Sequence, residues 1–172
     1  KTLDQLPEAE VAFIASNPST GAILSYQGGF NFSKSNFDRV KQSFPQAGSS
    51  FKPFIYSAAI ANGYKASDTI NDAPIIFEDQ NLESAWRPEN YTGKFYGPIR
   101  LREALVQSVN IVSIKLLREL GIDKAHTFLE NFGFPKSRLA PDLSLALGSS
   151  SFSPAEMIRA YNFLANSGEG KN

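Results

Sequence analysis

The sequence contains no cysteine and a single histidine, His126, among its 172 residues. A disulfide framework, a cysteine-based zinc site and a catalytic pair of cysteine and histidine are therefore excluded. Its 17 basic and 17 acidic residues cancel to a formal net charge of zero, so nucleic acid is not an expected partner. The apolar runs 54–61 and 111–117 are much shorter than the roughly 18 residues that indicate a membrane span.

The composition is that of a globular protein, with 42% apolar and 20% charged residues. This apolar share is enough for one sizeable core, so we expect a single domain. The sequence begins at Lys1, without a methionine, and ends in the polar, glycine-containing stretch 167–172. We therefore expect it to be a segment of a longer protein.

The first region, residues 1–63, opens with the pattern of a β-hairpin. Apolar runs at 12–15 and 22–26 flank a turn at 17–21 that contains proline, asparagine and glycine. Short apolar runs around such a turn predict two antiparallel strands.

A helix is predicted after the hairpin. Apolar residues with helical spacing follow Ser49 and stop at the pair Asn62-Gly63, which is a typical helix end. Because Pro53 is tolerated only in the first turn of a helix, the helix should begin at Ser49 or Ser50.

Residues 64–97 predict a long loop, and residues 98–172 predict a helical subdomain. The loop is rich in proline, asparagine, aspartate and aromatic residues, with one short strand expected at 74–77. The second part shows four stretches of helical apolar spacing. The expected helices are 99–105, then 111–120 before Gly121, a third capped by Asp123 and ending at Gly133, and a fourth from the capping box Ser153-Pro154-Ala155-Glu156 to about Ala165.

Ser49 and Lys52 are the first candidates for catalysis. A spacing of three residues at a helix start places both side chains on the same face, one turn apart. The positive end of the helix favours an alkoxide at Ser49 and disfavours a protonated Lys52, and burial would lower the lysine pKa further. The pair predicts a nucleophile beside a general base. Taken alone, however, the pattern arises by chance about once in a chain of this size.

Ser108-Val109-Asn110 is the second candidate, and it lies between two expected helices. Residues two apart in an extended link can point the same way, so a proton-relaying hydroxyl and a carbonyl-binding amide can face one cleft. An ordinary turn between helices is the simpler interpretation of these residues taken alone. His126, in the middle of the third expected helix, is interpreted as a solvated surface residue.

Together these residues resemble the transpeptidase domain of class A penicillin-binding proteins, relatives of the serine β-lactamases. The resemblance covers nearly the whole chain in the family's order. The segments that carry it are Asn17–Leu24 with Gly28-Gly29, Gly48–Phe54, Trp86–Tyr91, Leu101–Leu105 before Ser108–Asn110, and Leu145–Gly148 before Ser153–Glu156. The resemblance implies an α/β (α+β) fold of the β-lactamase and transpeptidase type, with an antiparallel sheet covered by helices and an all-helical subdomain.

The resemblance also implies a role for each candidate residue. Ser49 would attack the penultimate D-alanine carbonyl of a peptidoglycan stem peptide, with Lys52 as its base. Ser108 would pass the proton to the departing D-alanine, and Asn110 would hold the acyl amide. β-Lactam antibiotics would acylate Ser49, and no cofactor or metal is expected.

The Lys-Ser/Thr-Gly motif of this family is absent from the sequence. Of the three partial matches, Ser19-Thr20-Gly21 lacks the lysine, Thr92-Gly93-Lys94 has the wrong order, and Lys136-Ser137 is followed by Arg138. We therefore expect residues 1–172 to be the N-terminal part of a transpeptidase domain, whose closing strands and carboxylate-binding lysine belong to the remainder of that domain. The hairpin should pair with those strands, since an isolated hairpin is only marginally stable.

Three activities stay open. Class A membership implies a peptidoglycan D,D-transpeptidase, with a possible D,D-carboxypeptidase side activity, in a bifunctional glycosyltransferase/transpeptidase anchored at the periplasmic face of the bacterial inner membrane. A serine β-lactamase-type hydrolase shares the acylation step, and a non-catalytic β-lactam sensor would also keep Ser49 and Lys52. We predict the transpeptidase, because the matched segments resemble the synthases.

Overall fold

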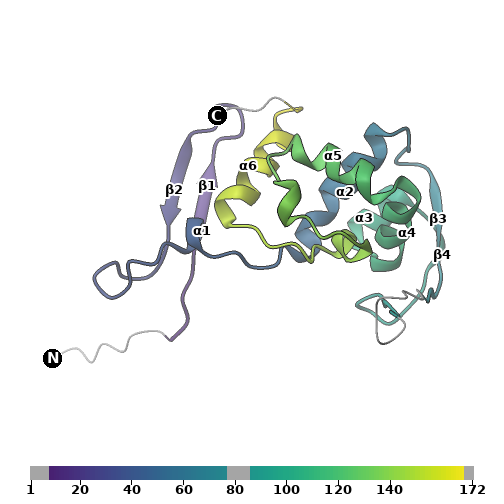
Figure 1. Ribbon diagram of the computed structural model, residues 1–172, viewed down its shortest axis with the longest axis horizontal. Coiled ribbons are helices and arrows are strands. Elements are labelled where there is room, and N and C mark those ends of the chain that lie inside the picture. Colours follow the sequence, from purple (N-terminus) through teal and green to yellow (C-terminus); the bar gives the residue numbers. More distant parts are fainter. Residues whose placement is uncertain (1–7, 77–85, 169–172) are drawn as a thin grey trace. The chain divides into compact units, whose positions relative to one another are not determined.

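The computed structural model describes residues 8–76 and 86–168 (Figure 1). Helices and two small antiparallel sheets make up the fold, which confirms the predicted mixed class. No helix in the described ranges is long and apolar enough to cross a bilayer. The strands are β1 (Phe13–Ser16), β2 (Ile23–Gln27), β3 (Thr69–Asp72) and β4 (Gly97–Arg100). The α-helices are α1 (Arg39–Gln42), α2 (Lys52–Ala61), α3 (Leu101–Val106), α4 (Asn110–Leu120), α5 (Ile122–Glu130) and α6 (Pro154–Ala165), and the 3-10 helices are η1 (Gly48–Phe51), η2 (Lys136–Arg138) and η3 (Leu143–Leu147).

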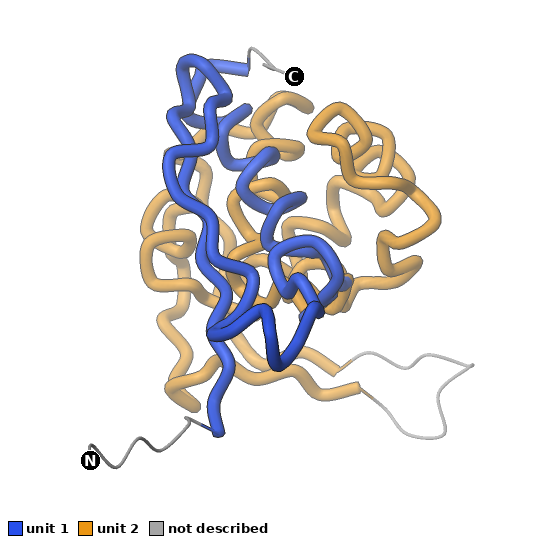
Figure 2. The backbone as a smooth tube through the Cα atoms, turned by 90° about the vertical axis from the view of Figure 1, so that its left-hand side faces the viewer, with its two compact units in different colours: residues 1–45, 151–172 blue, residues 46–150 orange. Residues whose placement is uncertain are grey.

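The chain divides into two compact units (Figure 2). The described residues of 1–45 and 151–172 form unit 1, and residues 46–150 form unit 2. Unit 1 therefore joins the two ends of the described chain, whereas unit 2 is one continuous segment.

Unit 1 contains the predicted hairpin, which is confirmed with antiparallel pairing of Phe13 to Gln27. Its turn is closed by a hydrogen bond of 2.8 Å from the Asn17 amide to the Ala22 carbonyl. Helix α6 packs on β1, and the Ser16 hydroxyl donates to the Asn162 amide oxygen at 2.8 Å. Every residue of β2 is exposed, so this strand presents apolar side chains to solvent.

Helix α6 begins with the predicted capping box. The Ser153 hydroxyl accepts from the Glu156 amide at 3.3 Å, and the Glu156 carboxylate accepts from the Ser153 amide at 2.8 Å. Because both bonds satisfy amides that have no partner within the helix, they fix the residue at which α6 starts.

The core of unit 2 forms where α2 packs against α4 and α5. Phe51 of η1 and Phe54 of α2 meet Phe132 and Phe134, with ring centroids 5.1 to 5.6 Å apart. Burial of such rings is among the largest apolar contributions a side chain can make. This aromatic cluster therefore anchors the turn η1, which carries Ser49.

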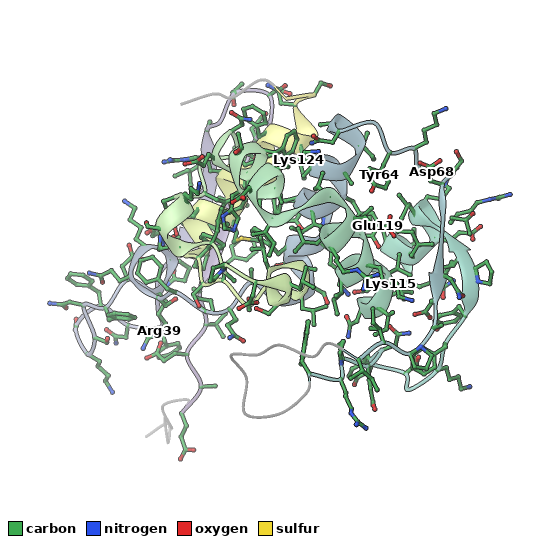
Figure 3. All side chains as sticks on the ribbon, turned by 45° about the vertical axis from the view of Figure 1, so that its right-hand side comes forward. Arg39, Tyr64, Asp68, Lys115, Glu119 and Lys124 are labelled. Carbon is green, nitrogen blue, oxygen red and sulfur yellow. The ribbon has the colours of Figure 1, made fainter. Side chains whose placement is uncertain are left out.

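Strand β3 is tied to α4, the helix that carries Lys115 and Glu119 (Figure 3). The Lys115 ammonium of α4 donates to the carbonyls of Asn71 and Ala73 at 2.7 and 3.2 Å. One turn further along α4, the Glu119 carboxylate accepts from the Tyr64 hydroxyl at 3.4 Å. The two bonds of Lys115 hold the end of β3 against α4, and the bond of Glu119 holds the segment before β3 against the same helix.

Three local predictions are wrong. Residues 74–76 form no strand, and Phe77 lies outside the described residues. The strand of this region is β3, five residues earlier, in which the side chains of Ile70 and Asp72 are buried. Pro74 has no amide hydrogen and cannot donate to a strand ladder. Ile99 belongs to β4 rather than to a helix, because it pairs with Ile70. Asp123 lies within the first turn of α5 and does not cap it, since the helix already starts at Ile122.

The interpretation of His126 as a solvated surface residue is also wrong. Only 6% of its surface is exposed, and its Nε2 atom forms a hydrogen bond of 2.9 Å with the Ala140 carbonyl. The chain that follows α5 contacts this helix through η2 and brings the Ala140 carbonyl to the imidazole. His126 is therefore a buried packing residue that satisfies a backbone carbonyl.

Candidate active site

Ser49 and Lys52 lie on the turn that leads into α2. The 3-10 helix η1 precedes α2, and the Lys52 amide donates to the Ser49 carbonyl. Since a 3-10 helix has three residues per turn, residues 49 and 52 lie directly above one another. Ser49 is exposed, whereas Lys52 has only 1% of its surface exposed. The predicted start at Ser49 or Ser50 falls within η1, which begins at Gly48, and α2 itself begins two to three residues later, at Lys52, with Pro53 in its first turn as expected.

The Lys52 ammonium brings the two candidate patterns together. Its Nζ atom donates to the Ser108 carbonyl at 2.7 Å, to the Ser108 hydroxyl at 3.0 Å and to the Asn110 amide oxygen at 2.7 Å. An ammonium has three donors, and each finds an acceptor here. Burial nevertheless lowers the pKa of Lys52 from its ordinary 10.5 to about 8. A lysine in this setting can lose its proton close to neutral pH.

Ser108 lies in the link between α3 and α4, and its backbone adopts an unusual conformation. Its φ is +53°, in the left-handed region that residues other than glycine rarely occupy. The neighbouring Val109 is buried with 2% exposure, and the Ser108 amide donates to the Leu105 carbonyl at 3.0 Å. Such a conformation persists where surrounding contacts hold it. Here it turns both the carbonyl and the hydroxyl of Ser108 toward Lys52.

Asn110 is the first residue of α4, and its side chain is held from two sides. Its Nδ2 atom donates to the Glu89 carbonyl at 2.9 Å, so its Oδ1 atom faces Lys52. An open cavity of about 430 Å³ adjoins these groups. The residues that line it are Ser49, Asn90, Tyr91, Thr92, Tyr96, Gln107, Ser108, Val109 and Asn110.

The Ser49 hydroxyl faces this cavity without an internal partner. Across residues 8–76 and 86–168 it makes no hydrogen bond, in contrast to the neighbouring Ser50, whose hydroxyl donates to the Ala47 carbonyl. The cavity thus gathers a free hydroxyl, a second hydroxyl at Ser108 and the amide of Asn110. A volume of this order suits a small or peptide-like ligand.

Asp72 and Asn90 are parts of the site that sequence reasoning missed. Asn90 lines the cavity and is 6% exposed, while Asp72 is fully buried against it. Asn90 lies in the segment Trp86–Tyr91, which is one of those that resemble the family. Nothing in the sequence indicates, however, that it contacts Asn110, which lies 20 residues further along the chain. Only the fold brings the two asparagines together.

A close backbone contact supports the turn that carries Ser49. The Gly48 amide donates to the Gly148 carbonyl at 2.9 Å, and the Ala47 amide donates to the Ser150 carbonyl at 3.0 Å. A Cβ atom built on Gly148 would lie 2.0 Å from the Gly48 carbonyl oxygen, far inside van der Waals contact. Gly148 also has a φ of +73°. Glycine is therefore required here for both space and backbone conformation.

Replacing Gly148 with alanine should destabilise the protein by about 3 kcal/mol or more, because the Gly48 backbone must move in addition to the φ strain. Gly133→Ala is the matched control, since Gly133 has a φ of +84° with open space around it and should cost only about 1–2 kcal/mol. The thermal unfolding temperatures of both variants measure the difference. Equal losses would show that the contact with Gly48 is unimportant.

The chain matches the penicillin binding protein transpeptidase domain family over residues 11–171. Penicillin-binding protein 1A of Pseudomonas aeruginosa is 49% identical over 95% of this chain and 20% of that protein. The crystal structure of penicillin-binding protein 1A from Haemophilus influenzae is 42% identical, with a TM-score of 0.89 over 94% of this chain and 24% of that one. An imipenem acyl-enzyme complex of penicillin-binding protein A from M. tuberculosis, 20% identical, shares the fold with a TM-score of 0.76 over 91% of this chain and 46% of that one. The chain spans about a fifth of the length of the curated relatives it matches.

Proposed function

The chain belongs to the family of penicillin-binding protein transpeptidase domains, and we propose that it carries the acylation machinery of a peptidoglycan D,D-transpeptidase. The observation that carries this proposal is the contact of buried Lys52 with both Ser108 and Asn110, one helical turn from the exposed hydroxyl of Ser49. A nucleophile, a base with a lowered pKa, a second hydroxyl and an amide at one cavity are what acyl transfer requires.

The proposed first step forms an ester on Ser49. Neutral Lys52 accepts the hydroxyl proton while Ser49 Oγ attacks the carbonyl of the penultimate D-alanine of a stem peptide. The backbone amide of Ser49 donates to the resulting oxyanion. Ser108 then delivers its proton to the departing nitrogen and takes a proton from the Lys52 ammonium, which becomes neutral again. The C–N bond breaks, and the terminal D-alanine leaves as an amine.

The second step transfers the acyl group. An amine of a second stem peptide attacks the ester and gives a proton to neutral Lys52. The new amide bond forms, the ester C–O bond breaks, and Lys52 returns the proton to the leaving Ser49 Oγ. Asn110 donates to the acyl amide in both steps, which keeps the carbonyl aligned. Attack by water instead of the amine would give a D,D-carboxypeptidase side reaction.

β-Lactams fit the same first step, because they present a strained amide in the shape of D-Ala-D-Ala. The proposed setting is the periplasmic face of a bacterial inner membrane, in a larger bifunctional glycosyltransferase/transpeptidase. The remainder of the transpeptidase domain is the expected partner of the exposed strand β2.

The proposal is tested by mapping the adduct of a fluorescent penicillin in the intact protein that contains this chain. Peptide mass spectrometry should place the adduct on Ser49, the adduct should persist, and a D-amino acid acceptor should accept acyl groups from a D-Ala-D-Ala peptide. Rapid release of penicilloate would indicate a β-lactamase-type hydrolase. A stable adduct without any transfer would indicate a sensor, and an adduct on another residue would overturn the assignment of Ser49.

The acylation rate should rise with pH and level off above about pH 8. Only the neutral amine of Lys52 can accept a proton, and with its pKa lowered to about 8 roughly a tenth of the molecules carry that form at pH 7. Stopped-flow penicillin acylation between pH 6 and 9.5 measures this profile. A rate that is constant over this range, in protein that stays folded, contradicts Lys52 as the base.

A further inference from the structure

Asp72 is a buried carboxylate that the proposed chemistry does not use. It ends β3 with no exposed surface, and both of its oxygens accept from the Asn90 Nδ2 atom, at 3.0 and 2.9 Å. The Tyr96 amide donates to it as well, at 2.8 Å. The Lys94 carbonyl accepts from the same Asn90 amino group at 2.9 Å. A carboxylate and a carbonyl only accept, so together they force the amino group of Asn90 to face them and its own carbonyl group to face away.

The carbonyl group of Asn90 points at the first turn of α4. Its Oδ1 atom accepts from the backbone amides of Asn110 and Ile111, at 3.0 and 3.2 Å. The first amides of a helix have no partner within it, and the local cap residue, Val109, has no side chain that could accept. Asn90 therefore caps α4 from a distance of 20 residues along the chain.

The residue before Asn90 orients the Asn110 side chain. The Glu89 carbonyl accepts from Asn110 Nδ2, which leaves Oδ1 for Lys52. Residues 89 and 90 thus bind both the backbone amide and the side chain of Asn110. The strained link at Ser108 comes immediately before this anchored residue.

We propose that Asn90 and Asp72 are positioning residues of the site: Asp72 fixes the direction of the Asn90 amide, and Asn90 holds the start of α4 so that Ser108 and Asn110 face Lys52. The carboxylate acts on the reacting groups only through Asn90. This inference rests on the proposed function, because acylation of Ser49 is its readout.

The test exchanges the two side chains in the intact protein. Asn90→Asp keeps an acceptor for the helix amides but sets a carboxylate against Asp72, so acylation by penicillin should slow at least about tenfold per folded molecule. In the double variant Asp72→Asn/Asn90→Asp, the amide at 72 donates to the carboxylate at 90, which again caps α4. We expect this exchange to recover the rate to within about threefold of wild type.

Lys115→Met is the matched control. Lys115 donates to the carbonyls on either side of Asp72 and forms no hydrogen bond with Asn90, so its loss removes two bonds between β3 and α4 while the bonds of the cap remain. It should acylate at the wild-type rate. If Asn90→Asp does not fold, Asp72→Asn, which keeps the size of the side chain, takes its place as the single variant that the exchange must rescue.

The inference is overturned if the single variant acylates at the wild-type rate, if the exchange is no faster than the single variant, or if Lys115→Met is equally slow. Rescue by the exchange is an outcome that a general loss of stability does not produce. Failure of the proposed acylation step is distinguishable, because wild-type protein would then form no adduct on Ser49 at all.

Discussion

Replacing Ser49 with alanine in the intact protein should reduce covalent labelling by a fluorescent penicillin to background, a loss of at least about a thousandfold. Acylation needs an oxygen nucleophile at the cavity, and in the proposed mechanism the free hydroxyl of Ser49 supplies it. Ser108 also lines the cavity, but its hydroxyl already accepts from Lys52. Removing one oxygen atom at residue 49 leaves the helix and the aromatic cluster beneath it unchanged, so the loss is chemical rather than structural.

Ser50→Ala is the control for this loss. Ser50 neighbours Ser49 on the same 3-10 turn, but its hydroxyl donates to the Ala47 carbonyl, so its removal should leave labelling within about twofold of wild type. Gel fluorescence after a fixed time, followed by a full time course, measures both variants. Normal labelling of Ser49→Ala, or loss of labelling in Ser50→Ala alone, would move the nucleophile away from Ser49.

Elements whose ends depend on neighbouring residues were predictable from the sequence. The capping box of α6 and the turn of the hairpin are local, since every group that defines them lies within a few residues. The helix that carries Lys52 was also placed well, because Pro53 and the pair Asn62-Gly63 mark its ends.

Elements that depend on distant partners were not predictable in this way. Ile99 has helical spacing with the residues that follow it, yet it joins a strand because Ile70 pairs with it across the long loop. His126 lies on a charged helix, yet the chain returning through Ala140 buries it. In both cases tertiary contacts override the local pattern.

The candidate site shows the same division. The sequence predicts which residue types act together, but the bonds from Lys52 to Ser108 and Asn110 join groups 56 and 58 residues apart. Sequence reasoning assigned Lys52 to Ser49 as a neighbour on one helix. The structure adds that the ammonium is held by the link before α4, and that Asn90 in turn holds α4.

Replacing Lys52 with methionine should slow acylation by about 10² to 10⁴-fold, the range typical of a lost general base. Methionine fills most of the buried space that Lys52 occupies, so the core beneath η1 stays packed. The effect should apply to a penicillin and to a D-Ala-D-Ala peptide alike, because both need the Ser49 proton removed. A small and equal effect on both substrates would exclude Lys52 as the base.

Ser108→Ala should separate the two substrates, since Ser108 is assigned to the leaving group rather than to the nucleophile. The nitrogen of a β-lactam leaves with release of ring strain and can take a proton from water, so penicillin acylation should fall less than about tenfold. The amine of a peptide is a poorer leaving group and needs a delivered proton, so peptide turnover should fall by about 10² to 10⁴-fold.

Acylation rates for both substrates, measured on the same preparation, give the ratio of the two effects of Ser108→Ala. Because the Lys52 ammonium also binds the Ser108 carbonyl, which alanine keeps, the lysine stays in place while the hydroxyl is lost. Normal peptide turnover in this variant would leave Ser108 as an ordinary turn between α3 and α4.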